Sequence, residues 1–427
     1  MYNCNLKIYK FANLIKKLNS IMHQFKKLNN IAGWLVFLIA SFVYFSTIEQ
    51  TVSFWDCGEY IATAYKLEVG HPPGAPLFQL FGRIFTLFAA QGTSEVAVAV
   101  NIMSALCSSF TILFLFWTIT AFGRKMFFKD EKNIEFGRII AVLGSGLVGA
   151  LAYTFSDSFW FSAVEGEVYA MSSLFTAVTF WCIMKWEQEA DKPHASRWLV
   201  LIGYLIGLSV GVHLLSLLTI PAMGMIYYFK KYEYTKAGAV KAFVSSMIIL
   251  GLVQGVIIPG AVSLISKFEL FFVNTIGLPF NSGTIIYFLA IIGAITFGLI
   301  YTKKHNKAVW NTAILGLMML LIGYSSFAIL VVRSNANPPI DENNPEDAVG
   351  LLSYLKREQY GSWPIVYGQH FNAKLDSREP YIDGNPIYAK DEKKGKYVII
   401  DKRKNTVPNY SKRDKMLFPR IWSSTQA

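Results

Sequence analysis

The chain has 427 residues, of which 53% are hydrophobic and only 16% are charged, and its mean hydropathy is +0.37. This composition is that of a membrane protein rather than of a water-soluble domain. We interpret the net charge of +12 as a topogenic signal that faces anionic lipid, and not as a nucleic-acid-binding surface.

About nine apolar runs before residue 333 approach the length of a spanning helix, which is about 20 residues. They lie near 31–48, 96–122, 139–156, 169–186, 198–213, 214–229, 242–266, 284–302 and 309–332. The fifth and sixth runs are short and nearly contiguous, so they form either a tight hairpin or one broken helix. The sequence therefore predicts an all-α polytopic membrane protein with about nine transmembrane helices.

The distribution of basic residues predicts the orientation in the membrane. Residues 1–30 hold six lysines and form a basic, amphipathic segment that we expect on the cytoplasmic side, with Met22 as an alternative start. Four later loops are also basic: 123–138, 185–197, 230–241 and 303–307. The loops between them are poor in Lys and Arg. This alternation predicts a membrane domain over 31–332, an N-terminus inside and a C-terminus outside.

The polar segment 333–427 is predicted to lie outside the membrane as a small mixed α/β unit. A helix is expected from Asn344 to Gly361, and strand-like pieces follow at 363–368 and 396–401. Such a segment has too few apolar runs for a large core of its own. We expect it to dock on the membrane domain, or the natural chain to continue beyond Ala427.

The first outer loop, residues 49–95, carries two acids three positions apart. Asp56 and Glu59 share one face of a helix that starts near Ser53. A carboxylate pair at a membrane edge needs a partner, a cation or water. The alternative is simple helix capping, because Ser53-x-x-Asp56 resembles a capping box.

The same loop continues with "GHPPGAP" at 70–76, where the prolines fix the backbone and the glycines permit tight turning. This sequence presents His71 rigidly, ahead of an amphipathic stretch that carries Arg83. Imidazole and guanidinium groups are suitable donors to a phosphate. The alternative is a purely structural turn before the next span.

A second acidic cluster lies in the next outer loop, where Glu165, Glu167 and Tyr169 fall on the same predicted side as Asp56. These acids either converge with Asp56 or merely solvate a short turn. Arg333, at the outer end of the last span, is either a membrane-edge anchor or a further phosphate ligand.

The stretches "FWDCGEYIATAYKLEVGHPPGAPLF" and "VEGEVYAMSSLF" resemble the transmembrane protein 260-like family of protein O-mannosyltransferases, in a bacterial branch long catalogued as a domain of unknown function. The resemblance covers about residue 30 to at least 350. Its most specific part is the D-x-G-E and HPPG-x-P run that begins at Asp56. It implies a clan C glycosyltransferase fold, in which the first outer loop carries the catalytic carboxylate.

The resemblance also implies roles for individual residues. Asp56 would be the base that accepts the acceptor proton, and Glu59 would orient the site or bind the acceptor. His71 and Arg83, with Arg333 as a further candidate, would bind the donor phosphate. The remaining predicted site-lining residues are Pro72, Pro73, Gly74, Glu165, Glu167 and Tyr169.

The implied reaction moves a sugar, mannose or another hexose, from a polyprenyl-phosphate donor to Ser or Thr of an exported protein at the bacterial inner membrane, with inversion. No cofactor is required in principle. A divalent cation, Mg²⁺ or Mn²⁺, is permitted, with Asp56, Glu59 and Glu165 as its ligands.

Two other functions remain open from the sequence. A secondary transporter also uses membrane carboxylates, but these are expected at mid-span, whereas the acids here cluster at one face. An envelope assembly or secretion component would use the acids only to solvate its outer surface.

Overall fold

A computed structural model describes residues 2–89, 93–128, 135–357, 364 and 366–419, with the backbone alone for 2–20. In this part of the chain, seven helical stretches are long and apolar enough to cross a membrane. They are α1 (Tyr2–Ser46), α4 (Thr93–Phe127), α5 (Phe136–Thr154), α7 (Val168–Glu189), α10 (Lys236–Leu252) continuing through η3 (Val253–Ile257), α11 (Ile258–Leu270) and η4 (Phe271–Ile276), α12 (Ser282–Lys304), and α13 (Ala308–Tyr324) continuing through η5 (Ser325–Phe327) and α14 (Ala328–Ser334). The predicted all-α polytopic membrane protein is confirmed.

The fifth and sixth apolar runs form a hairpin of two shorter helices, α8 (Ser196–Val210) and α9 (Thr219–Lys231), joined by η2 (Leu214–Leu218). Lys230 at the end of α9 donates to Asp191, which precedes α8, at 2.6 Å. Because the two far ends meet, the chain reverses direction between them, and a single broken helix is excluded.

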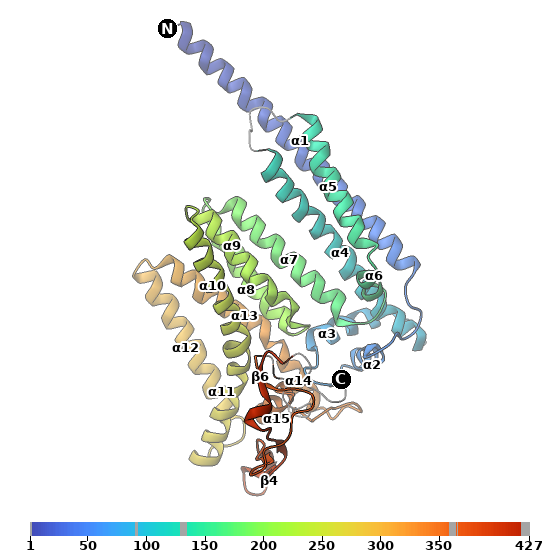
Figure 1. Cartoon of the computed structure of the whole chain (residues 1–427), viewed down its shortest axis with the longest axis vertical. Helices are drawn as coiled ribbons and strands as arrows, with labels where there is room; N and C mark the ends of the chain where they lie inside the picture. The colour runs from blue at the N-terminus through green and yellow to red at the C-terminus, as the bar shows by residue number, and fades with distance from the viewer. Residues whose placement is uncertain (1, 90–92, 129–134, 358–363, 365, 420–427) are drawn as a thin grey trace.

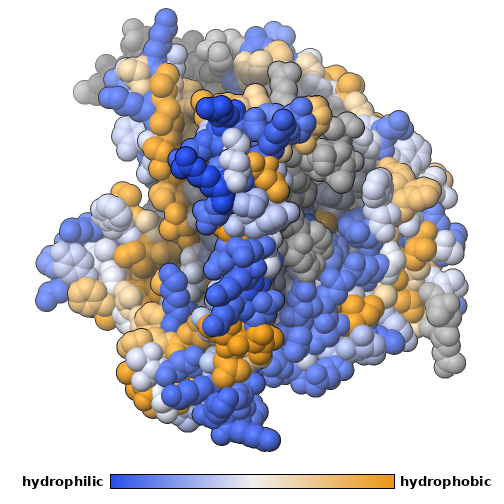
Figure 2. All heavy atoms as spheres, turned by 60° about the horizontal axis from the view of Figure 1, so that its bottom comes forward, coloured by the Kyte–Doolittle hydropathy of each residue, from blue (hydrophilic) through white to orange (hydrophobic). Residues whose placement is uncertain are grey.

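The N-terminal segment is not a separate surface helix. The backbone of α1 is continuous from Tyr2 to Ser46, so the basic segment prolongs the first span and extends beyond the bundle (Figure 1). Ion pairs join three of the basic loops at one end of the bundle, because Lys230 pairs with Asp191 and Lys125 pairs with Glu187. The first outer loop and the C-terminal segment lie at the opposite end (Figure 1). Figure 2 shows that end, where hydrophilic side chains gather and hydrophobic ones flank them.

The C-terminal segment is a small α/β unit. Its helix is α15 (Ala348–Leu355), and three two-stranded antiparallel sheets follow. The sheets pair β1 (Tyr367–Gln369) with β6 (Lys415–Leu417), β2 (Tyr381–Ile382) with β5 (Val407–Pro408), and β3 (Ile387–Asp391) with β4 (Lys396–Asp401). The expected helix corresponds to α15, and the expected strand-like pieces at 363–368 and 396–401 overlap β1 and match β4. Residue 363 and the expected helix end at Gly361 lie outside the described residues.

This unit docks on the membrane domain through Tyr397 of β4. Asn274 of η4 pairs with the Tyr397 backbone in both directions, at 2.9 and 2.8 Å. The Tyr397 hydroxyl donates to Glu269 of α11 at 3.4 Å. Glu269 is fully buried and also accepts from the backbone N–H groups of Asn281 and Thr284, at 2.6 and 2.9 Å. A buried carboxylate with several donors therefore joins the α11–α12 turn to the C-terminal unit.

We expect Glu269→Ala to lower the free energy of unfolding by about 3 kcal/mol, because it leaves buried N–H and O–H donors without an acceptor. Unfolding in mixed micelles would measure this loss. Glu392→Ala, in the exposed turn between β3 and β4, is the matched control and should change little. An equal effect of both substitutions would contradict a structural role for Glu269.

Candidate active site in the first outer loop

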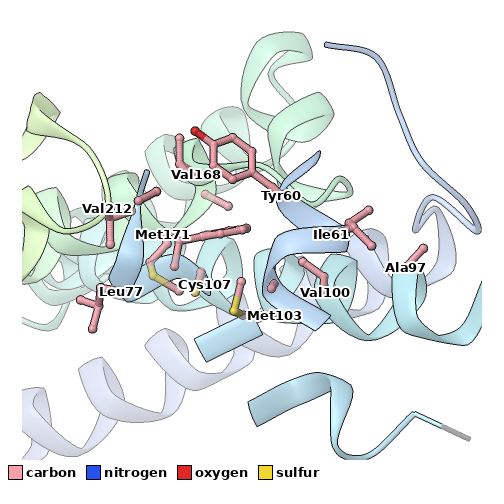
Figure 3. Packing of buried hydrophobic residues seen from close by; sticks show 14 of the residues in the cluster. Tyr60, Ile61, Leu77, Ala97, Val100, Met103, Cys107, Val168, Met171 and Val212 are labelled. Atoms are coloured by element: carbon pink, nitrogen blue, oxygen red, sulfur yellow. The ribbon is translucent and has the colours of Figure 1, made fainter. Parts of the chain in front are cut away.

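The first outer loop folds as two short helices, α2 (Cys57–Lys66) and α3 (Pro76–Thr86), packed on α4 and α7. Tyr60, Ile61 and Ala64 face inward from α2 because they are three to four positions apart. They meet apolar side chains of α3, α4 and α7 in one buried cluster (Figure 3). This cluster fixes the position of α2 against the membrane domain.

Asp56 occupies the N-cap position of α2, but its side chain makes no capping hydrogen bond. Its backbone, at φ −86° and ψ 1°, is not the extended conformation of a capping residue. The helix also begins at Cys57 rather than near Ser53, so the capping-box interpretation is wrong. The Asp56 side chain is 57% exposed and free to meet a ligand.

Asp56 and Glu59 both face the His71 imidazole. Glu59 Oε1 accepts from the His71 backbone N–H at 2.5 Å, and Oε2 lies 3.0 Å from Nδ1. On the other side of the ring, Nε2 lies 3.7 Å from Asp56 Oδ2. Gly70 permits this approach, because a Cβ there would lie 2.5 Å from Glu59 Oε1. The structure therefore brings together three of the predicted site residues.

The charges of this group are coupled. The hydrogen bond to Glu59 raises the pKa of His71 above its ordinary 6.5, with further contributions from the negative charges of Glu59, Asp56 and Glu342, while burial opposes the shift. Burial would raise the pKa of Glu59, but the two hydrogen bonds from His71 outweigh it and the pKa is lowered. An imidazolium held by a carboxylate is therefore favoured near neutral pH.

The HPPG turn is held by its own backbone. The Gly74 N–H donates to the His71 carbonyl at 2.8 Å, and the Pro72–Pro73 peptide bond is cis. Gly74 has φ +84°, which favours glycine, and a Cβ there would also lie 2.3 Å from the Tyr354 hydroxyl. The prolines and Gly74 therefore shape the turn that presents His71.

The C-terminal segment braces this loop. The Tyr354 hydroxyl of α15 donates to the Gly70 carbonyl at 2.5 Å. Val69 pairs with the segment after the last span, because its N–H donates to Ile340 and its carbonyl accepts from Glu342, both at 3.0 Å. The loop that presents His71 is thus held by residues that follow it by more than 250 positions in the chain, and Tyr354 lies 284 positions after Gly70.

The second acidic cluster lies beside the first, and its acids do not simply solvate a turn. Glu165 and Glu167 are 5% and 6% exposed. Glu165 Oε2 accepts from the Cys57 thiol at 3.6 Å, and Glu167 caps α7 by accepting from the Val168 N–H at 3.0 Å. Burial raises the pKa of Glu167 to about 7, and the negative charges of Asp56 and Glu165 add to this shift.

Tyr169 follows on α7 and is 48% exposed. Its ring lies against that of His213, with the centroids 5.5 Å apart. Tyr169 therefore presents an exposed hydroxyl near Glu167, and His213, between α8 and η2, packs behind it.

The two predicted arginines do not join this group. Arg83 Nη1 donates to the Tyr65 carbonyl, and Arg333 Nε donates to the Leu67 carbonyl, both at 2.5 Å. These carbonyls belong to the C-terminal end of α2, about 15 Å along the helix from Asp56. Unpaired carbonyls at a helix end attract cations, so both arginines stabilise α2 in this structure.

Two residues near the imidazole were not among the predicted site residues. The Tyr60 ring packs against His71, with the centroids 5.7 Å apart. The charge of Glu342 acts on His71, and burial and the charge of Glu59 raise the pKa of Glu342. Tyr60 lies four positions after Asp56, about one helical turn, so the sequence spacing could have placed it near the site. Glu342 is placed by tertiary structure alone.

A divalent cation is compatible with part of the predicted ligand set. Ligand atoms of Asp56, Glu59 and His71 lie within 4.8 Å of one another. Glu59 holds Nδ1, which leaves Nε2 facing Asp56, as in carboxylate-oriented histidine ligands. His71 thus takes the place that was predicted for Glu165, whose carboxylate binds the Cys57 thiol instead.

Comparison with known proteins gives matches over this region. Residues 56–236 match the family described as Protein O-mannosyl-transferase TMEM260 N-terminal domain, and residues 361–427 match a family of unknown function, DUF8416. The chain is 27% identical over 197 residues to Protein O-mannosyl-transferase tmem260 of Dictyostelium discoideum. The aligned region covers 44% of this chain and 22% of that protein. It is 26% identical over 176 residues to Protein O-mannosyl-transferase TMEM260 of Mus musculus. This aligned region covers 41% of this chain and 22% of the mouse protein.

The aligned part thus spans 22% of the length of each of these curated relatives. The family match begins in the acidic first outer loop, because Asp56 is its first residue. It also includes the second acidic cluster and the α8–α9 hairpin. Through residues 56–236 the chain is therefore similar to the N-terminal domain of TMEM260-like protein O-mannosyl-transferases.

Proposed function

We propose that the protein transfers a hexose, mannose being the first candidate, from a polyprenyl-phosphate donor to Ser or Thr hydroxyls of exported proteins at the bacterial inner membrane. The observation that carries this proposal is the Asp56 carboxylate. It is exposed, free of capping bonds, and lies beside a histidine whose pKa is raised by its hydrogen bond to another carboxylate.

In this mechanism Asp56 accepts the proton of the acceptor hydroxyl as its oxygen attacks the anomeric carbon. The new bond from carbon to the acceptor oxygen forms as the bond to the phosphate oxygen breaks, so polyprenyl phosphate leaves and the anomeric centre is inverted. The His71 imidazolium, oriented by Glu59, stabilises the charge on the departing phosphate. Glu167 and Tyr169, which lie close enough to Asp56 to feel its charge, contact the sugar or the acceptor in this mechanism.

A groove in the membrane domain suits a lipid-borne donor. It has a volume of about 480 Å³ and lies between α4, α5, α7 and the η2–α9 segment. Its lining includes Leu215, which is hydrogen-bonded through its N–H to His213, the neighbour of Tyr169. An isoprenoid tail in this groove would place its phosphate towards the outer site.

The contacts of Glu269 argue against a transporter. Within the described spanning helices this acid is the one with no exposure, and four protein donors occupy its oxygens. An acid saturated by fixed donors serves structure rather than ion passage. The acids whose pKa values are raised by burial, Glu165 and Glu167, lie instead at the end of the bundle that carries the first outer loop.

The experiment for this function compares the envelope proteins of a deletion strain with those of the strain restored by the native gene. Mass spectrometry of Ser and Thr peptides should show hexose only in the restored strain, and would identify the sugar and the acceptor together. Identical glycopeptides in both strains would refute protein glycosylation.

We expect transfer to persist after chelation with EDTA, because the imidazolium of His71 already supplies positive charge at the departing phosphate. The assay uses the purified full chain with a polyprenyl-phosphate hexose and an acceptor peptide, with and without EDTA. Activity lost in EDTA and restored by Mn²⁺ would contradict this expectation and make Asp56 and His71 Nε2 metal ligands.

A further inference from the structure

A second polar cavity lies at the end of the bundle that carries the basic loops, far from the candidate active site. It has a volume of about 310 Å³ and is enclosed by α1, α4 and α7. Three of its lining residues are cationic: Lys26, Arg124 and Lys185. No acid is among its described lining residues.

The acids nearest in sequence already have other partners. Glu187 pairs with Lys125, Glu189 pairs with Arg197 at 2.9 Å, and Asp191 pairs with Lys230 at 2.6 Å. In the described part of the chain, the three cations of the cavity form no ion pair with an acid. A pocket that gathers positive charge without an acid favours an anion.

Aromatic side chains form part of the cavity wall, among them Trp117 and Trp181. The Lys185 ammonium lies 4.9 Å from the centre of the Trp181 ring. Cationic groups and aromatic walls together suit a phosphate ester attached to an apolar body.

We propose that this cavity binds the phosphate of an anionic phospholipid from the leaflet on the side of the basic loops. Arg124 and Lys185, both half-buried, would contact the phosphate, with Lys26 at the entrance. The acyl chains would leave between the helices, along the apolar and aromatic walls. A free phosphate has the same charge chemistry but gains nothing from these walls, so the lipid is the favoured source. This proposal is independent of sugar transfer.

The test uses the purified full chain in detergent micelles doped with phosphatidylglycerol, with native mass spectrometry to measure lipid retention. We expect the native protein to retain phosphatidylglycerol in preference to phosphatidylcholine. The double substitution Arg124→Gln with Lys185→Gln should weaken retention about 30-fold, since it removes two cations from the phosphate. The control pair, Lys303→Gln with Lys304→Gln, removes the same charge from the exposed end of α12 and should leave retention unchanged.

Equal losses in both double variants would overturn the proposal, because they would show general attraction of lipid to a basic surface. Displacement of the lipid by inorganic phosphate at equal concentration would also overturn it and assign the cavity to a soluble anion. Thermal melting checks that the variants fold. If the double variant does not fold, Lys185→Gln alone should still weaken retention, and unchanged retention in this variant would refute the proposal.

Discussion

Asparagine at position 56 is expected to lower kcat/KM for sugar transfer by about 10³-fold, because it removes the proton acceptor while keeping the shape of the side chain. The effect should fall mainly on kcat, since the Asp56 side chain makes no capping hydrogen bond to α2. Rates would be measured with the purified chain, a polyprenyl-phosphate hexose and an acceptor peptide. Thermal melting should show unchanged stability.

The matched control is Asp157→Asn. Asp157 is an exposed acid in the first turn of α6 (Asp157–Ala163), at the same end of the bundle. It should keep native activity. Full activity of Asp56→Asn would exclude Asp56 as the base and would direct attention to Glu167, whose pKa of about 7 also suits a base.

Replacing Glu59 by Gln is expected to reduce transfer at neutral pH by about 10- to 100-fold, because Glu59 orients and charges the histidine. The hydrogen bond to Glu59 is the main reason that the His71 pKa is raised. Since the imidazolium is the active form, the alkaline limb of native activity should follow His71, with activity lost as the pH rises through the raised His71 pKa. In Glu59→Gln this alkaline loss should begin at a lower pH.

The measurement is the pH profile of kcat/KM for the native protein and Glu59→Gln. Glu95→Gln, an exposed acid in the first turn of α4, should keep the native profile. An alkaline limb at the same pH in all three proteins would show that Glu59 does not hold the proton on His71. Lost activity without a change of profile would indicate a structural role alone.

The sequence was sufficient for the main architecture because long apolar runs have one stable solution in a bilayer, the helix. It also indicated that Asp56 and Glu59 are neighbours and that a rigid loop presents His71, whereas the contacts of the imidazole with both carboxylates became visible only in the structure. It predicted about nine spanning helices, whereas seven helical stretches in the described part of the chain are long enough to span. The fifth and sixth predicted spans are the shorter helices α8 and α9.

The positions of Arg83 and Arg333 could not be predicted. Both depend on the C-terminal end of α2, whose carbonyls become available only once the loop has folded against α14. The start of α15 shows the same limit. Asn344 lies in a turn with φ +43°, and Asp347 caps the helix instead, where it also pairs with Lys390 at 3.4 Å. In both cases the position of the side chain depends on a residue far away in the sequence: Leu67 for Arg333, and Lys390 for Asp347.

The contact between Tyr354 and Gly70 has a consequence for biosynthesis. The loop that presents His71 emerges from the ribosome early, whereas the hydroxyl that braces it is made some 284 residues later. A nascent chain with its first spans inserted therefore holds the chemical groups of the site without their support. The loop is completed only when the last span has been inserted and α15 folds back on the outer surface, so maturation of the site is coupled to completion of membrane insertion.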